Sequence, residues 1–498
     1  MSRSAVSHTP LRSVPAPAQD PRHVVIAAHE IMLMVLVIGC IAVAWAFPFR
    51  PVKYATIVTF GLVLLGQTTR RPAIGLALVA FASPALDLSP PGLFPVRGLN
   101  AETALIGLLL FIWARTHKME GPDPLRSLLS RMVLVYVVLI LVSSINSWFM
   151  WRVGLFDLLA KSKNHLSWLL FLPVAFHALR DKRDQKLVFF ACTLSLFLIV
   201  AQSVNIYWMP FVSGTLERYR ASGMLAQQPN LYGGALALYV PILIAMSTKP
   251  IGSRWMRLWL GVAALLAGFN LILTLSRGAW AAAAAGVLAV ALVRNVKLLL
   301  LVAALGIGYQ FWVPEAAIDR VKETADADGD IGTMDQIADD STQMRVEQYR
   351  SLKAMVLPRP ILGWGYKSYP KVFERLGTLG RQKGAHSTYC QVATEEGLIG
   401  LAVLAALFLI IISTSIKAYR FCEDPFYRWM GIGLLGAALS MLVGMASGAR
   451  FEAQKIFIYF WIMIGIAERE AILAQMRGGS AAPVLVSPQQ PPSVSGRS

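Results

Sequence analysis

GLIGLAVLAALFLIIISTSI, the stretch at residues 397–416, contains no charged side chain. As a helix, it would rise by about 30 Å, which is the thickness of the hydrocarbon core of a bilayer. Glu395 and Glu396 precede the stretch and Lys417 follows it, so charges stand at both of its ends. This stretch therefore predicts a membrane-spanning helix, and it decides the fold class of the chain.

The composition of the whole chain agrees with that prediction. Hydrophobic residues make up 56% and charged residues 15% of the sequence, against about 45–50% and about 25% in soluble globular domains. Apolar runs of similar length recur, and the weakest are 52–66, 73–88 and 167–179. The candidate spans are 28–47, 52–66, 73–88, 101–115, 132–151, 167–179, 187–209, 231–247, 257–275, 279–293, 297–312, 397–416, 429–447 and 455–467. We therefore predict an all-α, polytopic transmembrane helical bundle of about 12–14 spans.

The spacing of these runs divides the chain into five parts. Residues 1–22 and 471–498 are rich in Pro, Ser and Gly, a composition that predicts disordered tails. Residues 23–312 hold the N-terminal transmembrane helices and 397–470 the C-terminal ones. Between them, residues 313–396 form one large loop, which contains helix-like stretches and should be partly folded. Loops of this length in compact proteins are often functional.

The basic residues indicate the orientation. If the N-terminus lies in the cytoplasm and the spans alternate, each cytoplasmic loop is basic, as the positive-inside rule requires. The loop 313–396 then faces the other side, and both termini are cytoplasmic. The net charge of +18 is explained by these loops and by anionic membrane lipids. Because no nucleic-acid-binding motif accompanies the charge, we expect no nucleic-acid partner.

Four arginines remain on the outer side, where the positive-inside rule does not favour them. They are Arg218, Arg220, Arg277 and Arg450, and each lies near the outer end of a candidate span. Single arginines in such positions can extend to lipid headgroups or form local salt bridges. Four together are more typical of an anion site, because arginine is always charged and binds phosphate with two parallel hydrogen bonds.

One histidine lies beside these arginine-bearing segments. His386 stands at the end of the large loop, shortly before the span at 397–416. It could be a packed or headgroup-level residue. The alternative is a general base, because histidine titrates near neutral pH without further help.

Other motifs are less specific. Gly363-Trp364-Gly365 predicts a tight turn, either packed or displaying an aromatic surface to a sugar or lipid. The acidic stretch 326–332 lacks the EF-hand spacing, and the role of the insert 324–340 stays open. The four cysteines have no metal-ligand spacing, so neither a disulfide framework nor a zinc site is indicated. We expect no metal and no cofactor.

These motifs, in this order, resemble the O-antigen ligase / O-antigen polymerase superfamily of bacterial inner-membrane glycosyltransferases. The resemblance covers roughly residues 200–470. It is carried by Arg220-Ala-Ser-Gly, Ser276-Arg277-Gly278-Ala279, the turn at 363–365, and His386-Ser387 followed by Glu396-Gly397-Leu398-Ile399-Gly400. A lipopolysaccharide O-antigen ligase is the favoured member.

The resemblance implies a multi-pass enzyme of the bacterial inner membrane whose active site faces the periplasm. Its donor would be a glycan on undecaprenyl pyrophosphate, and its acceptor a sugar hydroxyl of the lipid A core. His386 would be the catalytic base, and Arg220 and Arg277 would bind the pyrophosphate. Arg218 and Arg450 join them mainly on the predicted topology. No metal is required, and a single displacement would invert the anomeric centre.

Three alternatives stay open. The same superfamily includes O-antigen and exopolysaccharide polymerases and protein O-oligosaccharyltransferases, which differ in their acceptors. A lipid-linked glycan flippase belongs to another class. It would prefer charged residues inside the bundle, and the middles of the spans carry almost none. The sequence therefore favours group transfer at the outer interface over passage through the membrane.

Overall fold

The computed structural model describes residues 61–63, 65–84, 101–116, 127–215, 220–248, 253–294, 340–377, 384–448, 450–451 and 457–480, together with isolated positions elsewhere. Within these ranges the regular elements are helices, and the one isolated bridge pairs Gly223 with Ala226. Several predicted segments lie outside the described residues. They are the tail 1–22, residues 481–498 of the C-terminal tail, most of the spans 28–47, 52–66 and 297–312, and nearly all of the loop segment 313–339, which includes the acidic insert up to residue 339.

Six of the described helices are long and apolar enough to cross a membrane. They are α5 (Leu128–Trp151), α8 (Lys182–Val212), α9 (Pro229–Ser247), α10 (Arg254–Leu273), α18 (Gly397–Phe421) and α19 (Pro425–Ala446). Each one coincides with a span expected from the sequence. The prediction of an all-α, polytopic membrane bundle is therefore confirmed.

Further helices complete the described bundle. They are α3 (Pro72–Ala82), α4 (Ala101–Thr116), α11 (Arg277–Arg294) and α20 (Ile458–Ser480). The expected span at 167–179 is instead the 3-10 turn η3 (Ser167–Leu170) followed by α7 (Phe171–Ala178), after the polar helix α6 (Leu155–Leu166). The elements α6, η3 and α7, with 12, 4 and 8 residues, are each too short to span a bilayer alone.

Helix α20 corrects the predicted boundary of the C-terminal tail. We expected disorder from residue 471, but the helix continues to Ser480. Its polar residues have partners in the bundle: Glu468 accepts a hydrogen bond from the Ser127 hydroxyl, and Arg469 donates one to a backbone carbonyl at 3.1 Å. These hydrogen bonds give the polar residues partners inside the protein where the helix extends beyond its apolar part.

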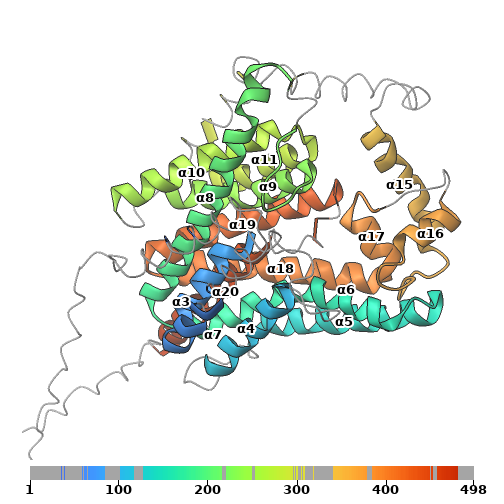
Figure 1. Cartoon of the computed structure of the whole chain (residues 1–498), viewed down its shortest axis with the longest axis horizontal. Helices are drawn as coiled ribbons and strands as arrows, with labels where there is room; N and C mark the ends of the chain where they lie inside the picture. Colours follow the sequence, from blue (N-terminus) through green and yellow to red (C-terminus); the bar gives the residue numbers. More distant parts are fainter. Residues whose placement is uncertain are drawn as a thin grey trace, which may run out of the picture.

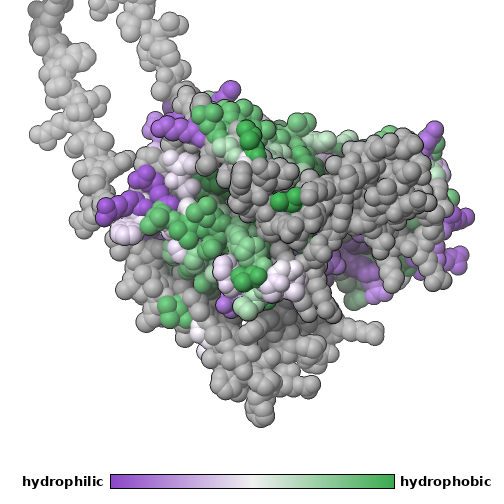
Figure 2. Space-filling view, turned by 90° about the horizontal axis from the view of Figure 1, so that it is seen from above, coloured by the Kyte–Doolittle hydropathy of each residue, from purple (hydrophilic) through white to green (hydrophobic). Residues whose placement is uncertain are grey.

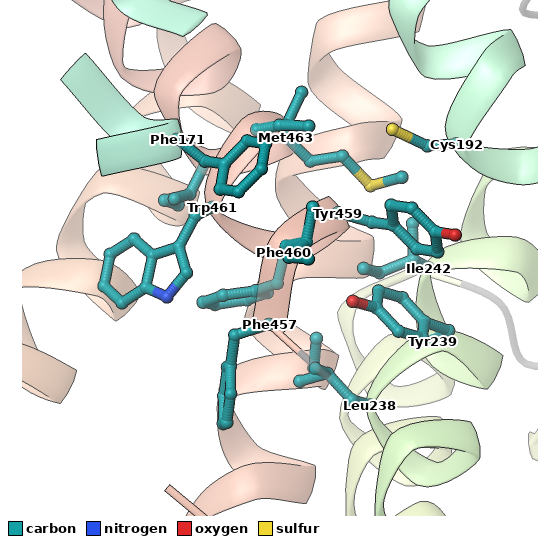
Figure 3. Packing of buried hydrophobic residues seen from close by; sticks show 14 of the residues in the cluster. Phe171, Cys192, Leu238, Tyr239, Ile242, Phe457, Tyr459, Phe460, Trp461 and Met463 are labelled. Carbon is teal, nitrogen blue, oxygen red and sulfur yellow. The ribbon is translucent and has the colours of Figure 1, made fainter. Parts of the chain in front are cut away.

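Aromatic side chains and glycines hold the bundle together. Figure 3 shows Tyr459 and Trp461 of α20 packed among buried residues of α7, α8 and α9. The hydroxyl of Tyr459 donates a hydrogen bond to Ser195 of α8 at 2.8 Å. Where α11 meets α19, a Cβ on Gly286 would lie 2.5 Å from the carbonyl oxygen of Gly436. The two backbones therefore approach as closely as small residues permit.

The bundle has two distinct ends. Helices α15 (Asp340–Val356), α16 (Tyr369–Leu376) and α17 (Thr388–Glu395) lie together at one end, on the right of Figure 1. We call this the loop end. At the far end the ion pairs Arg71–Asp184 and Lys182–Asp424 join helix termini. Figure 2 shows hydrophobic residues over the middle of one face and hydrophilic residues toward its two sides, as expected for a bundle that crosses a bilayer.

Candidate functional site

Helix α15 holds the segment that contains His386. The Gln348 side-chain carbonyl accepts a hydrogen bond from the backbone N–H of His386 at 2.7 Å. One residue further along α15, the Tyr349 hydroxyl lies 3.1 Å from the Ser387 hydroxyl and 2.9 Å from the carbonyl of Ala446. Ser387 itself caps the N-terminus of α17. The histidine is therefore fixed by its backbone between α15, α17 and the end of α19.

The next residue of that segment attaches it to the loop that follows α19. Thr388 donates a hydrogen bond to the Gly448 carbonyl from both its backbone N–H (3.2 Å) and its hydroxyl (2.9 Å). The backbone N–H of Arg450 donates to the same hydroxyl at 3.1 Å. His386 and Arg450, which are 64 residues apart in the sequence, are thus connected by a short hydrogen-bonded path.

Arg450 occupies a space lined by glycines. Its exposed fraction is only 3%. A Cβ at Gly234 of α9 would lie 2.9 Å from its Cδ, and one at Gly278 of α11 would lie 3.5 Å from its Nη2; Gly444 of α19 also faces the guanidinium. Any larger side chain at Gly234 or Gly444 would crowd the arginine. The three glycines, from three helices, therefore make the room in which this cation lies.

The charge of Arg450 has little compensation in the described part of the chain. Its guanidinium makes one side-chain hydrogen bond, from Nη2 to the Ser447 hydroxyl at 3.4 Å. Burial, together with the nearby charge of Arg345, lowers the pKa of Arg450 to about 10, so the group stays protonated at neutral pH. A buried cation normally requires an anionic partner. The arrangement is therefore suited to receive an anion.

The imidazole of His386 has the properties that a general base requires. Its side chain is half-buried, and within the described residues its imidazole makes no hydrogen bond. Burial, and secondly the charge of Arg345, lower the pKa of His386 below its usual 6.5. At neutral pH the ring is therefore uncharged and can accept a proton.

Arg345 was not among the residues singled out in the sequence. It lies on α15, three and four residues before Gln348 and Tyr349, so it shares their helix face. Its charge affects the pKa of both His386 and Arg450. The helix-like stretch from Thr342 to Met355, with Arg345, Gln348 and Tyr349 at helical spacing, was the available signal.

Arg220 supports the turn between α10 and α11. Its Nε donates to the carbonyl of Thr274 at 2.9 Å, and its Nη2 donates to Leu275 at 3.1 Å and to the side chain of Asn230 at 2.9 Å. Leu275 has a φ of 49°, which is a strained conformation for a non-glycine residue. The arginine therefore stabilises this strained turn by donating hydrogen bonds to the carbonyls at the end of α10.

Arg277 follows that turn as the first residue of α11 and is half-buried. Gly278, the next residue, faces Nη2 of Arg450. The structure thus brings the segments of three predicted arginines, Arg220, Arg277 and Arg450, to the loop end. Arg218, the fourth, lies outside the described residues.

The turn at Gly363-Trp364-Gly365 is a packing element. Gly363 and Gly365 have φ of 64° and 98°, which glycine adopts at little cost. The backbone N–H groups of Trp364 and Gly365 donate to Thr394 and Glu395 at 2.9 and 2.8 Å, and the indole N–H donates to the Met355 carbonyl at 2.7 Å. Of the two interpretations of this motif, these contacts favour packing over a display platform.

Comparison with known proteins agrees with the resemblance seen in the motifs. Residues 262–405 match a family model described as O-Antigen ligase. The matched segment includes Arg277, Arg345 and His386, whereas Arg220 and Arg450 flank it. A comparison of the chain with curated proteins finds no match. Among the described residues, no three His, Cys, Asp or Glu side chains are grouped as metal ligands.

Proposed function

Residues 262–405 match the O-antigen ligase family model, and from that premise we propose that the chain is a glycosyltransferase of the bacterial inner membrane. It moves a glycan from undecaprenyl pyrophosphate to a sugar hydroxyl of the lipid A core, on the periplasmic side. The large loop and the loop end of the bundle face the periplasm. The reaction needs no metal and no cofactor.

One observation carries this proposal. A neutral base and a buried cation occupy segments that are hydrogen-bonded to each other through Thr388. His386 can accept a proton, and Arg450, whose charge has little compensation among the described residues, lies beside the N-terminus of α11. Transfer from a pyrophosphate carrier requires both properties, because one group must take the proton of the acceptor and another must stabilise the leaving group.

The proposed step is a single displacement. The acceptor hydroxyl oxygen forms a bond to the anomeric carbon while its proton passes to the imidazole of His386. The bond between the anomeric carbon and the pyrophosphate oxygen breaks, and its electron pair leaves with undecaprenyl pyrophosphate. Arg450 and Arg277 stabilise the negative charge that develops there. One displacement without a covalent intermediate inverts the configuration of the anomeric centre.

The remaining arginines have different proposed roles. Arg220 makes three hydrogen bonds to the protein, so we assign it mainly a positioning role, in which it sets the turn that presents Arg277 to the pyrophosphate. Arg218 is proposed as a further contact for the same anion. Arg345 adds to the effect of burial in lowering the pKa of His386, and it is proposed to add positive potential on the donor side of the site.

The test is glycan transfer by the purified protein in detergent, with a lipid-linked donor and lipid A core as substrates. Transfer in detergent would exclude a flippase, since no transport is possible there. Product NMR should show inversion of the anomeric configuration. In a deletion strain, long polymer should accumulate on the carrier lipid. Accumulation of single repeat units instead would identify a polymerase and overturn the proposed acceptor.

A further inference from the structure

A short turn after α15 exposes an unusual amount of apolar surface. Leu357, Ile361 and Leu362 have exposed fractions of 62%, 62% and 51%, although they lie within six residues of one another. Burying a side chain of this type stabilises by about 1.5–3 kcal/mol. Three of them left in water would be a considerable cost, so a cover of apolar character is expected over this turn.

Backbone hydrogen bonds fix the depth of the turn relative to α18. The carbonyl of Pro360 accepts from the N–H of Leu398 at 2.7 Å, and that of Ile361 accepts from Ile399 at 3.3 Å. Leu398 and Ile399 lie in the first turn of α18, whose uncharged part, 397–416, matches the thickness of the bilayer core. The turn therefore lies level with the edge of the hydrocarbon.

The exposed apolar surface continues onto two spanning helices. Leu398 of α18 is exposed, and so are Trp148 and Phe149 at the end of α5. Asn146, one turn away on α5, donates a hydrogen bond to the carbonyl of Gly363 at 3.3 Å, so α5 ends next to the turn. The patch thus extends the lipid-facing surfaces of the bundle instead of standing apart on the loop.

Aromatic rings and cations adjoin this patch. The guanidinium of Arg359 lies 5.1 Å from the ring centre of Trp364, and the Lys371 ammonium lies 5.6 Å from that of Trp151. The Trp151 indole donates to the Trp364 carbonyl at 3.1 Å. Tryptophan and basic residues beside exposed aliphatic ones are typical of the headgroup level, where the cations meet lipid phosphates.

We propose that the turn Leu357–Leu362, which we call the anchor turn, inserts into the bilayer leaflet at the loop end. Its aliphatic side chains enter the outermost part of the hydrocarbon, and Arg359 contacts lipid phosphates. Because α15 leads directly into this turn and also holds His386 through Gln348, the anchor turn sets the height of the histidine above the lipid. The inference rests on the membrane-spanning helices and does not depend on the proposed reaction.

Spin labels at single introduced cysteines test this inference in lipid nanodiscs. In a Cys40→Ala background, Cys192, Cys390 and Cys422 remain and are buried. Leu362→Cys carries the label in the anchor turn, and Leu357→Cys gives a second position in case the first variant fails to fold. Leu409→Cys, on the exposed middle of α18, is the lipid control. Glu374→Cys, exposed on α16, is the water control.

The readout is the collision rate of each label with oxygen, which concentrates in lipid, and with a water-soluble nickel complex. We expect the labels at 362 and 357 to collide more with oxygen than with nickel, as the label at 409 does. Nickel collisions equal to those at 374 would overturn the proposal. Low collision rates with both reagents, together with disulfide-linked dimers of the unlabelled variants under oxidising conditions, would also overturn it and assign the patch to contact between copies of the chain.

Discussion

The backbone N–H of Arg450 donates a hydrogen bond to the hydroxyl of Thr388 at 3.1 Å, and that hydroxyl donates to the Gly448 carbonyl at 2.9 Å. Thr388 is only two residues after His386. The proposed base and the proposed anion-binding cation come from separate loops, and the Thr388 side chain therefore helps to fix their relative positions.

Thr388→Val should weaken the contact between the His386 segment and the loop that carries Arg450. The substitution keeps the shape of the side chain but removes the hydroxyl that accepts from the N–H of Arg450 and donates to the Gly448 carbonyl. The N–H of Arg450 keeps its other acceptor, the Gly448 carbonyl, at 2.8 Å, so the cost is that of the lost hydrogen bonds, about 0.5–1.5 kcal/mol each. We expect a lower melting temperature and at least about tenfold slower transfer, because small displacements of reacting groups are costly. Thr388→Ser retains the hydroxyl and should transfer at close to the wild-type rate. Equal rates for the Val and Ser variants would argue against this role.

The pH profile should report the state of His386. The base acts when it is neutral, and its pKa is lowered below 6.5 by burial and by the charge of Arg345. Activity should therefore be fully present at pH 7 and be lost as the pH falls through a midpoint below 6.5. Arg345→Gln removes a positive charge, raises the pKa of His386 and should move this acid limb to higher pH. An acid limb unchanged by Arg345→Gln would contradict the assignment.

The glycines around Arg450 should be sensitive to one added methyl group. In Gly234→Ala the new Cβ would lie 2.9 Å from Cδ and 3.0 Å from Nε of Arg450, so the flexible side chain would have to move. We expect the protein to fold and the KM for the lipid-linked donor to rise, by up to about a hundredfold. Gly268→Ala on α10, where nothing lies within 4 Å of the added Cβ, is the matched control. Donor KM values that are the same in both variants would show that Arg450 does not bind the donor.

Arg220 and Arg277 should differ in what their loss affects. Arg220→Ala removes three hydrogen bonds that support the turn after α10, and bonds to charged groups contribute about 1.5–3 kcal/mol each. It should lower the melting temperature and, through the turn, slow the reaction. Arg277→Ala should weaken binding of the lipid-linked donor with a smaller change in melting temperature. Thermal unfolding and donor titration in the same detergent compare the two variants. A larger loss of stability in Arg277→Ala and a larger loss of donor affinity in Arg220→Ala would contradict these assignments.

The spanning helices could be predicted because lipid imposes a simple requirement on composition. The expected spans 231–247 and 429–447 correspond to Pro229–Ser247 and Pro425–Ala446, since long uncharged runs have few alternatives in a bilayer. The segment 167–179 was apolar but short, and the structure divides it into a 3-10 turn and a helix of eight residues. Hydrophobicity alone could not indicate that division.

The relation between the site residues depends on tertiary contacts that no local pattern encodes. The sequence indicated Arg450 from its topology, but its burial results from Gly234, Gly278 and Gly444, which come from three helices. Arg220 was expected to bind the anion directly, and its neighbours in the sequence gave no sign that it bonds to the carbonyls of residues 274 and 275. Arg345 lay on a predicted helix, but only the packing of α15 against the His386 segment relates it to the base.

The central claim is that His386 is the base of a glycan transfer reaction. The most direct measurement is the single-turnover rate of transfer by purified His386→Ala, with donor binding measured in parallel. We predict donor affinity close to that of the wild type and a rate reduced by about 10²–10⁴-fold, as expected when a general base is removed. Transfer by His386→Ala at the wild-type rate would contradict the account.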